Sequence, residues 1–516
     1  MFSFAINMVS VCTILIAFAN VCNAARILGV VPTPSYSHQV VFQPIWKELS
    51  LRGHQVTTIT TDPLNDPALA NLTEIDLHFL YGNNPDKLQE FIDSNIFGAA
   101  LFVIKAYETI GDIVLSHPDV QNLIKDVNRK FDVVMIEHSV LAMRMFAERF
   151  NAPLIMLSPV DALTDLQTDM GNPTHPVLYP NILVSTTDNP SLLDRIVFVA
   201  YKLFTESLKT FVVIPRQQVL VNKYFGTQYT ALQNIDISLA LVNSDTTFYT
   251  GKPLIPTIVQ IGGGTHRTPK KPLPIELKNT LDAAKHGFIY FSLGSNVKSK
   301  DLSKETRDVI LETFSEIPYT VLWKFESDEL PNKPKNVITS KWFPQQDVFK
   351  HPNIKLFITQ GGLQSMEEAI YDHIPMLALP FAGDQNFNVN RMIHRGFGLS
   401  LNYRTLRKDE FKTSILEIIN NSKYRNTVKE FAELAMDQPM TGLEKAIWWT
   451  EYVIRHKGTR HMRSPLLDIP FYQYYLLDVI AILTTTLIVI VGIIFLVFKF
   501  LFRIVQTVTF RKVKTQ

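Results

Sequence analysis

The stretch from residue 357 to residue 385 contains the densest group of side chains and glycines suited to a charged ligand. In FITQGGLQSMEEAIYDHIPMLALPFAGDQ, an apolar strand is followed by Gly361 and Gly362, where the backbone can come close to a ligand. The pattern predicts a helix beginning near Ser365, whose positive end and unpaired N–H groups suit a phosphate or diphosphate. Glu368, one turn into that helix, can accept hydrogen bonds from ribose hydroxyls.

Metal and cysteine chemistry find little support in the sequence. There is no Asp-x-Asp motif and no tight cluster of His, Asp and Glu, so we expect neither a metal nor another cofactor. The chain has two cysteines, Cys12 and Cys22, and both lie within its first 24 residues. If that segment is cleaved, the mature protein contains no thiol.

Composition sets the class of protein. A chain of 516 residues with 46% hydrophobic residues is too long for one ordinary domain and predicts two globular domains. Its 50 Lys and Arg against 48 Asp and Glu give a net charge of +2, so no broad basic surface for nucleic acid is expected.

The elements that would position these residues alternate between strands and helices. Short apolar strands at RILGVV, HQVTTIT and FDVVMI are separated by amphipathic stretches, a pattern typical of a doubly wound parallel sheet. The first helical stretch has Ser37 as its candidate N-cap and Gly53 as its stop, and Pro44 inside it predicts a kink or a late start.

A second series of the same kind follows a stretch rich in glycine and proline at residues 251–274. FIYFS, TVLWKF, LFIT and MLALP are its predicted strands. We therefore expect a domain over residues 25–250 and another over residues 251–455, facing each other across a cleft.

Both ends of the chain carry apolar segments. Residues 1–24 resemble a secretory signal peptide. The alternative is a retained membrane anchor, which is less favoured because the apolar run is short for a bilayer span. Residues 479–498 contain no charge and predict a transmembrane helix after a membrane-proximal segment at 456–478, with a buried core helix as the alternative.

The basic tail at residues 499–516 predicts the orientation of that helix. By the positive-inside rule the tail is cytoplasmic and the domains are lumenal, as in a single-pass type I protein. Lys512 and Lys514 resemble a dilysine signal for return to the endoplasmic reticulum, ordinary juxtamembrane lysines being the alternative.

The segment 357–385 is similar to the signature of family 1 UDP-glycosyltransferases, in particular the membrane-bound animal group and its insect members. The similarity extends over essentially the whole chain. It implies a GT-B fold: two Rossmann-like domains, the first binding an acceptor and the second a UDP-sugar, with a diphosphate leaving group stabilised without a metal. Oligomeric state stays open, a homo-oligomer being one alternative.

The resemblance also implies roles for individual residues. Trp342 matches the tryptophan that stacks on uracil, and Gln345 the residue that hydrogen-bonds the uracil edge. Gln360 stands where most members have a histidine against the diphosphate, and its amide can donate a hydrogen bond but cannot carry charge. The remaining donor-side matches are Ser365, Gly361 and Gly362 for phosphate, Glu368 for ribose, and Asp384 with Gln385 for sugar hydroxyls.

Ser292 and Ser295, in FSLGS, match residues that approach the phosphates from the opposite wall. Each of these side chains also has an ordinary structural explanation. Gly-Ser turns are common, Trp342 can be a core aromatic, Glu368 a solvated helix residue and Asp384 a helix cap.

His38 follows the first strand and matches the family's general base, which removes a proton from the acceptor hydroxyl. Glu137, directly after FDVVMI, stands where many members have an Asp that orients the base. Its longer side chain leaves a structural role equally open, and Ala142 occupies the place where insect relatives can carry an Asp instead. His54, in RGH, is expected to be structural.

The predicted function is transfer of a sugar, with inversion, from a UDP-sugar to hydroxyl groups of small lipophilic acceptors. Insect-like features favour UDP-glucose over UDP-glucuronate, and conjugation of metabolites or foreign compounds is the expected role. The alternative is a membrane-anchored carrier that binds nucleotide sugars without turnover. Asn71 and Asn420 lie in glycosylation sequons that would be lumenal.

Overall fold

The structure is a computed structural model that describes residues 24–83, 87–184, 189–249 and 251–513. Residues 24–169 and 173–463 belong to one compact unit, and residues 170–172 and 464–513 to a second. Residues 1–23 of the predicted signal peptide, including both cysteines, and Lys514 lie outside the described residues.

The first half of the large unit is built on a parallel sheet of seven strands, in the order β3-β2-β1-β4-β5-β6-β7. Strand β1 lies inside the sheet, between β2 and β4. The strands are β1 (Arg26–Val31), β2 (Gln55–Thr60), β3 (Leu72–Asp76), β4 (Val133–Glu137), β5 (Leu154–Ser158), β6 (Leu239–Val242) and β7 (Ile258–Gln260).

The second half contains a parallel sheet of six strands, in the order β10-β9-β8-β11-β12-β13. Its strands are β8 (Phe288–Ser292), β9 (Thr320–Lys324), β10 (Val337–Ser340), β11 (Ile354–Thr359), β12 (Met376–Ala378) and β13 (Gly398–Ser400). The two doubly wound halves confirm the predicted α/β fold.

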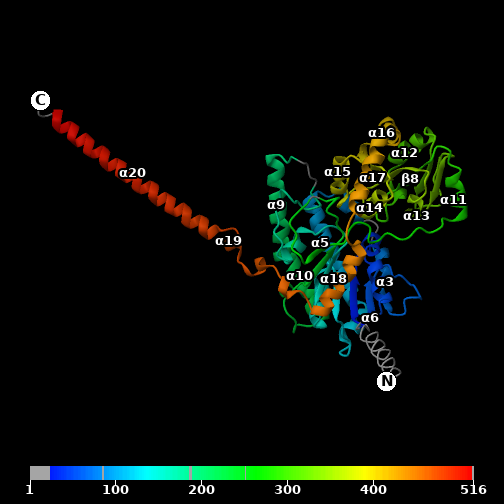
Figure 1. Ribbon diagram of the computed structural model, residues 1–516, viewed down its shortest axis with the longest axis horizontal. Coiled ribbons are helices and arrows are strands. Elements are labelled where there is room, and N and C mark those ends of the chain that lie inside the picture. Colours follow the sequence, from blue (N-terminus) through cyan, green and yellow to red (C-terminus); the bar gives the residue numbers. More distant parts are fainter. Residues whose placement is uncertain (1–23, 84–86, 185–188, 250, 514–516) are drawn as a thin grey trace, which may run out of the picture. The chain divides into compact units, whose positions relative to one another are not determined.

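Helices connect the strands in both halves (Figure 1). Those of the first half are α2 (Tyr36–Val40), α3 (Gln43–Leu51), α4 (Lys87–Asp93), α5 (Ile96–Ser116), α6 (Pro118–Lys125), α7 (Met145–Arg149), α8 (Thr164–Asp169), α9 (Leu192–Leu208) and α10 (Ile214–Tyr224). Those that follow are α11 (Ile275–Asp282), α12 (Lys304–Ser315), α13 (Gln345–Phe349), α14 (Leu363–Tyr371), α15 (Gln385–Arg395), α16 (Lys408–Asn420), α17 (Ser422–Met436) and α18 (Gly442–His456).

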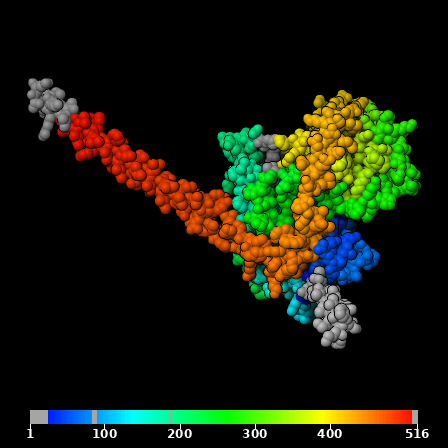
Figure 2. Space-filling model, in the orientation of Figure 1, coloured from blue at the N-terminus to red at the C-terminus, as the bar shows by residue number. Residues whose placement is uncertain are grey.

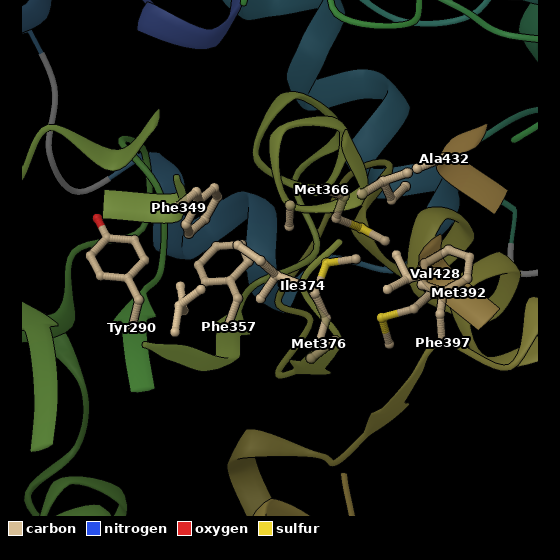
Figure 3. Close-up of a cluster of buried hydrophobic side chains, with 14 of the residues drawn as sticks. Tyr290, Phe349, Phe357, Met366, Ile374, Met376, Met392, Phe397, Val428 and Ala432 are labelled. Carbon is tan, nitrogen blue, oxygen red and sulfur yellow. The ribbon is translucent and has the colours of Figure 1, made fainter. Parts of the chain in front are cut away.

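The second sheet is buried on both faces. Phe288 and Tyr290 of β8 belong to one hydrophobic cluster, and the alternating Ile289 and Phe291 belong to another. Alternate residues of a strand point to opposite faces, so the two clusters lie on opposite sides of the sheet. Figure 3 shows part of the first cluster, where Phe349 lies close to Tyr290 and Phe357. This packing explains the near-continuous apolar strands in the sequence.

The predicted domain boundaries need correction at two points. The segment expected to be a linker contains β7, which pairs with β6, so the first sheet extends to Gln260 rather than ending by residue 250. Helix α18, assigned to the second domain, packs on the first half, where Ala446 and Ile447 share a cluster with Ile27. Burial of the apolar face of α18 against the first sheet explains why the chain returns there.

The first predicted helix is interrupted, as Pro44 suggested. It forms α2 and α3, with Pro44 in the first turn of α3, where a missing N–H is tolerated. The N-cap position of α2 is Ser35 and not the expected Ser37.

The smaller unit contains α19 (Phe471–Tyr474) and α20 (Leu477–Val513). Within α20, residues Leu477–Thr507 are long and apolar enough to cross a membrane, and the predicted span at 479–498 falls inside that range. Helix α20 is therefore a candidate membrane span by length and composition.

Candidate active site

A cleft within the large unit brings together most of the residues that the sequence singles out. The first half contributes Tyr36, Ser37, His38, Val40 and Val160 to its lining. The predicted donor-binding residues that line it are Ser292, Ser295, Trp342, Gln360, Gly362, Ser365, Glu368, Asp384 and Gln385. Gln345 and Gly361 were also predicted as ligands, and they lie behind this lining.

Polar contacts join the two halves beside the cleft. The Asn296 amide Nδ2 donates a hydrogen bond to Ser35 Oγ at 3.1 Å. The Gln364 amide donates to the Pro159 carbonyl at 2.8 Å. These contacts hold the segments that follow β1 and β5 close to the segments that follow β8 and β11.

Two glycines allow the loops of the second half to approach each other around Gln360. Gly294 and Gly361 have φ values of 79° and 88°, in the left-handed region that favours glycine. A Cβ atom on Gly294 would lie 2.4 Å from the Gln360 amide nitrogen. Gln360 is therefore held between the loop after β8 and the start of α14, where its amide can donate to a diphosphate.

The Glu368 carboxylate is fixed by neighbours on both of its oxygens. The Gln345 amide donates to Oε2 at 2.6 Å, and the Gln346 amide donates to Oε1 at 2.9 Å. His266 Nε2 lies 3.4 Å from Oε1. Gln345 also donates to Ser365 Oγ at 3.1 Å. Gln345 thus orients two other predicted ligands, a role that the sequence did not suggest.

Trp342 is more than half exposed, unlike a core aromatic. Its ring meets Tyr36 edge to face, with ring centroids 5.5 Å apart, and the ammonium group of Lys324 lies 5.3 Å from the Trp342 ring. Tyr36 and Lys324 line the cleft and were both missed in the sequence. The signal for Lys324 was its place at the carboxyl end of β9, where parallel sheets bind ligands.

His38 and Glu137 form a hydrogen-bonded pair at the carboxyl ends of adjacent strands. His38 Nδ1 and Glu137 Oε1 are 2.5 Å apart, and the Thr33 backbone N–H donates to Glu137 Oε2 at 3.3 Å. The Glu137 side chain is fully buried, whereas His38 is one quarter exposed. Burial opposes ionisation of Glu137, but the imidazole and the hydrogen bonds outweigh it and lower its pKa below the ordinary value.

A second pocket meets the cleft at His38. Its lining shares three residues with the cleft: His38, Val160 and Asp384. Asp384 accepts a hydrogen bond from the Asn388 amide at 2.7 Å. Burial raises the pKa of the Asp384 carboxyl, and the Asn388 bond and the charge on His38 only partly offset this effect. His38 and Asp384 therefore lie where two ligands would meet.

The second pocket has a volume of about 380 Å³ and a largely apolar lining, including Val103, Ile104, Leu163 and Ile182. His138 and Asp165, whose ring nitrogen Nε2 and carboxylate lie 3.2 Å apart, provide a polar patch. No motif in the sequence pointed to these residues, because they come from separate segments of the first half.

The remaining predictions concern metals and glycans. Among the described residues, no group of three or more His, Cys, Asp and Glu side chains could hold a metal ion. Asn71 and Asn420 are both exposed. Their glycosylation stays a prediction, as does the absence of a cofactor.

The known proteins to which this chain is similar are UDP-dependent sugar transferases. Residues 26–514 match a family model described as UDP-glucoronosyl and UDP-glucosyl transferase. UDP-glucosyltransferase 2 of Dactylopius coccus is 32% identical over 474 residues, with 90% of each chain covered. Human UDP-glucuronosyltransferase 2B15 is 28% identical, over 90% of this chain and 91% of its own.

A solved structure supports the fold. The glycosyltransferase VinC, solved in complex with DTDP, superimposes with a TM-score of 0.56 at 14% identity. The match covers 84% of this chain and all of VinC. The two halves thus have the arrangement of a GT-B glycosyltransferase.

Proposed function

Because this chain belongs to the UDP-glucoronosyl and UDP-glucosyl transferase family and is a UDP-glycosyltransferase, we propose that it transfers glucose from UDP-glucose to small lipophilic acceptors. The acceptor group is a hydroxyl, and the anomeric carbon is inverted. The observation that carries this proposal is the His38–Glu137 pair, which lies where the donor cleft meets an apolar pocket.

The pair is suited to general base catalysis. A carboxylate acceptor at Nδ1 keeps the proton of neutral His38 on that nitrogen and leaves Nε2 free to take one. Nε2 removes the acceptor hydroxyl proton as the oxygen attacks the anomeric carbon. The new C–O bond forms as the bond to the diphosphate breaks, and UDP leaves with the electron pair. Glu137 stabilises the imidazolium that results.

Donors on the second half stabilise the negative charge that develops on UDP. The N-terminus of α14 and the Gln360 amide supply fixed dipoles, and Lys324 supplies a positive charge. The Lys324 ammonium donates to the Gly294 carbonyl at 2.9 Å and to Glu326 at 2.8 Å, so its position is fixed by neighbours.

The preference for glucose rests on the names of the insect relatives and on Asp384. A carboxylate placed against the sugar hydroxyls can accept hydrogen bonds from glucose, whereas the carboxylate of glucuronate adds a like charge nearby. The apolar pocket beside His38 supports a lipophilic acceptor.

A transfer assay tests the proposal. The full chain in phosphatidylcholine vesicles is incubated with labelled UDP-glucose or labelled UDP-glucuronate and a panel of phenols and alcohols. We expect release of UDP and label in the acceptor with UDP-glucose. Faster transfer from UDP-glucuronate would refute the donor preference. Binding of both donors without transfer would establish the carrier alternative.

We further propose that α20 crosses the endoplasmic reticulum membrane, with the large unit in the lumen. Protease added outside sealed microsomes should then remove only the basic tail, and the lumenal remainder should be protected. Replacing Lys512 and Lys514 by alanine should let the protein leave the endoplasmic reticulum. An unchanged location would refute the retrieval signal, and loss of the whole chain to protease would refute the orientation.

A further inference from the structure

The apolar pocket beside His38 contains a second contact between a histidine and a carboxylate. His138 Nε2 lies 3.2 Å from Asp165 Oδ2, and both side chains line the pocket. His138 directly follows Glu137 at the end of β4, and Asp165 lies in the first turn of α8. The His138 side chain is 8% exposed and the Asp165 side chain 43%, so the carboxylate is more open to the pocket than the imidazole.

This polar patch of His138 and Asp165 is not placed to supply a second base. The base must reach the hydroxyl that attacks the anomeric carbon, and that carbon lies in the donor cleft. His38 lines both the cleft and the pocket, whereas His138 and Asp165 belong to the lining of the pocket and not to that of the cleft. The polar patch therefore meets a part of the acceptor away from the reacting hydroxyl.

The cations near Asp165 are held by a different carboxylate. Arg144 donates to Asp169 Oδ2 at 2.7 Å, and the Lys209 ammonium contacts Asp169 Oδ1. Lys209 also donates to the backbone carbonyl of Asp165 at 3.2 Å, and not to its carboxylate. Within the described part of the chain, His138 is the one side chain at ion-pair distance from the Asp165 carboxylate. Its Oδ1 atom is thus left for a ligand.

The Asp165 carboxyl is ionised in the pocket. Burial opposes ionisation, but the charge and hydrogen bond of His138, together with the charges of Lys209 and Arg144, outweigh burial and lower the pKa below its ordinary value. An ionised carboxylate accepts hydrogen bonds and donates none. A ligand that fills the pocket with carbon alone would remove water from this charge without replacing the hydrogen bonds. The carboxylate therefore favours a ligand that brings a hydrogen-bond donor.

One small molecule is large enough to meet both His38 and the polar patch. Tyr107 of α5 lines the pocket, and after burial the charges of Glu137 and Asp165 raise the pKa of its phenol, so both carboxylates act on the same side chain. Helix α9, at the edge of the folded unit in Figure 2, lines the same pocket. Its volume of about 380 Å³ lies within the range of sites for small ligands.

We propose that Asp165, held by His138, binds a second hydrogen-bond donor of the acceptor, a hydroxyl or an ammonium group, while the reacting hydroxyl lies at His38. This inference rests on the proposed function and deepens it, because it names the acceptor class. The preferred acceptors are lipophilic molecules with a donor group at each end. Asp165 determines specificity at the far end, where no bond forms or breaks.

Three acceptors of nearly equal size test the assignment. They are para,para′-biphenol, its mono-methyl ether and para-phenylphenol, whose far ends carry a donor, an acceptor alone and neither. The same three end groups on a single ring test a shorter separation. We measure kcat/KM with saturating UDP-glucose and the full chain in phosphatidylcholine vesicles. In one of the two series the diol should exceed the other two acceptors by about 10- to 100-fold, the usual effect of a hydrogen bond to a charged group.

Replacements of Asp165 assign that preference to its carboxylate. Asp165→Leu should lower transfer to the diol by about 10- to 100-fold and leave transfer to para-phenylphenol unchanged or faster. Asp165→Asn keeps a carbonyl oxygen and should retain part of the preference. Asp119→Leu is the matched control, because Asp119 is an exposed aspartate in the first turn of α6, outside the pocket. The affinity for UDP should be the same in all variants.

Equal kcat/KM for the three acceptors of both series in the unmodified protein would overturn the proposal. An equal fall with all acceptors in Asp165→Leu, without recovery in Asp165→Asn, would show that the carboxylate only supports the fold and would overturn it too. If no acceptor is glucosylated at all, the proposed function fails instead. Calorimetric binding of the diol and of para-phenylphenol to the same variants then tests the polar patch by the same difference.

Discussion

The two sides of the active cleft are built on different principles. On the donor side, polar groups from residues 292–385 are fixed by directional hydrogen bonds, as when Gln345 and Gln346 hold Glu368. On the proposed acceptor side, apolar side chains from α5, α8 and α9, among other segments, surround a volume without fixing a pattern of donors and acceptors. A polar ligand of constant chemistry fits the first side, and a family of lipophilic ligands fits the second.

The difference implies that donor binding, acceptor binding and catalysis can be separated by substitution. His38 and Asp384 line both pockets. Substitutions at these two residues therefore test most directly whether binding and catalysis can be separated.

The largest effect is expected at His38. His38→Ala removes the base, and transfer should fall by about 10² to 10⁴, the usual contribution of general base catalysis. UDP binding, measured by calorimetry, should be nearly unchanged because its proposed ligands lie in the other half. His286→Ala, an exposed histidine outside both linings, is the control. Loss of UDP binding together with transfer would mean that His38 holds the fold.

Trp342→Ala should weaken the donor side alone. Loss of stacking on uracil is worth about 1–3 kcal/mol, so the dissociation constant of UDP should rise by about one to two orders of magnitude. Trp342→Phe keeps an aromatic ring, so its dissociation constant for UDP should lie between those of the unmodified protein and the alanine variant. The acceptor KM should stay the same. Normal affinity of the alanine variant for UDP would refute the uracil assignment.

Ile104→Trp should alter the acceptor side alone. The larger side chain fills part of the apolar pocket and should change the relative kcat/KM for bulky and small acceptors by about tenfold, as expected for a change of volume in a hydrophobic pocket. UDP affinity should be unaffected. Leu101→Trp, an exposed position on the same helix outside the pocket, is the control. Equal effects of both variants would show that α5 does not select acceptors.

The smallest effect concerns Glu367, which joins the two halves. Its carboxylate accepts a hydrogen bond from Asn243 at 3.2 Å and lies 3.8 Å from His266. Burial raises the pKa of Glu367 to about 7, although His266 and Asn243 oppose this. Hydrogen bonding and charge from Glu368 outweigh burial and raise the pKa of His266.

Both groups bind protons more tightly in the folded chain, so their stabilisation is complete at low pH and is lost as pH rises through their folded pKa values. Relative to Glu367→Gln, the unmodified protein should lose about 1 kcal/mol of stability between pH 6 and pH 7.5. Thermal unfolding at the two pH values measures this, with Glu433→Gln on the exposed face of α17 as the control. A stability difference between the unmodified protein and Glu367→Gln that does not change with pH would contradict this prediction.

Sequence reasoning located best the elements and the cleft-lining residues that follow strand ends in contiguous motifs. The parallel strands, the helix after Gly362 and the cluster from Gln360 to Gln385 could all be predicted, because periodicity and turn chemistry are local. Lys324 and Tyr36 were missed because their proximity to Trp342 depends on tertiary packing. The pairing of β7 and the return of α18 also depend on tertiary burial, which a glycine- and proline-rich stretch does not reveal.

The contact between Glu137 and His38 could not be decided from the sequence. From the sequence, the length of the glutamate side chain left a structural role open, and only the register of β1 and β4 shows that it reaches His38 Nδ1. The apolar pocket was beyond prediction altogether, because no spacing rule connects Ile104, Leu163 and Ile182.

The stereochemistry of the product tests the central claim most directly. That claim is that the His38-activated acceptor displaces UDP in one step at the junction of the two pockets. With α-linked UDP-glucose and a phenol acceptor, proton NMR of the product should show only the β-glucoside. An α-glucoside would contradict direct displacement and would require a different arrangement of base and donor in this cleft.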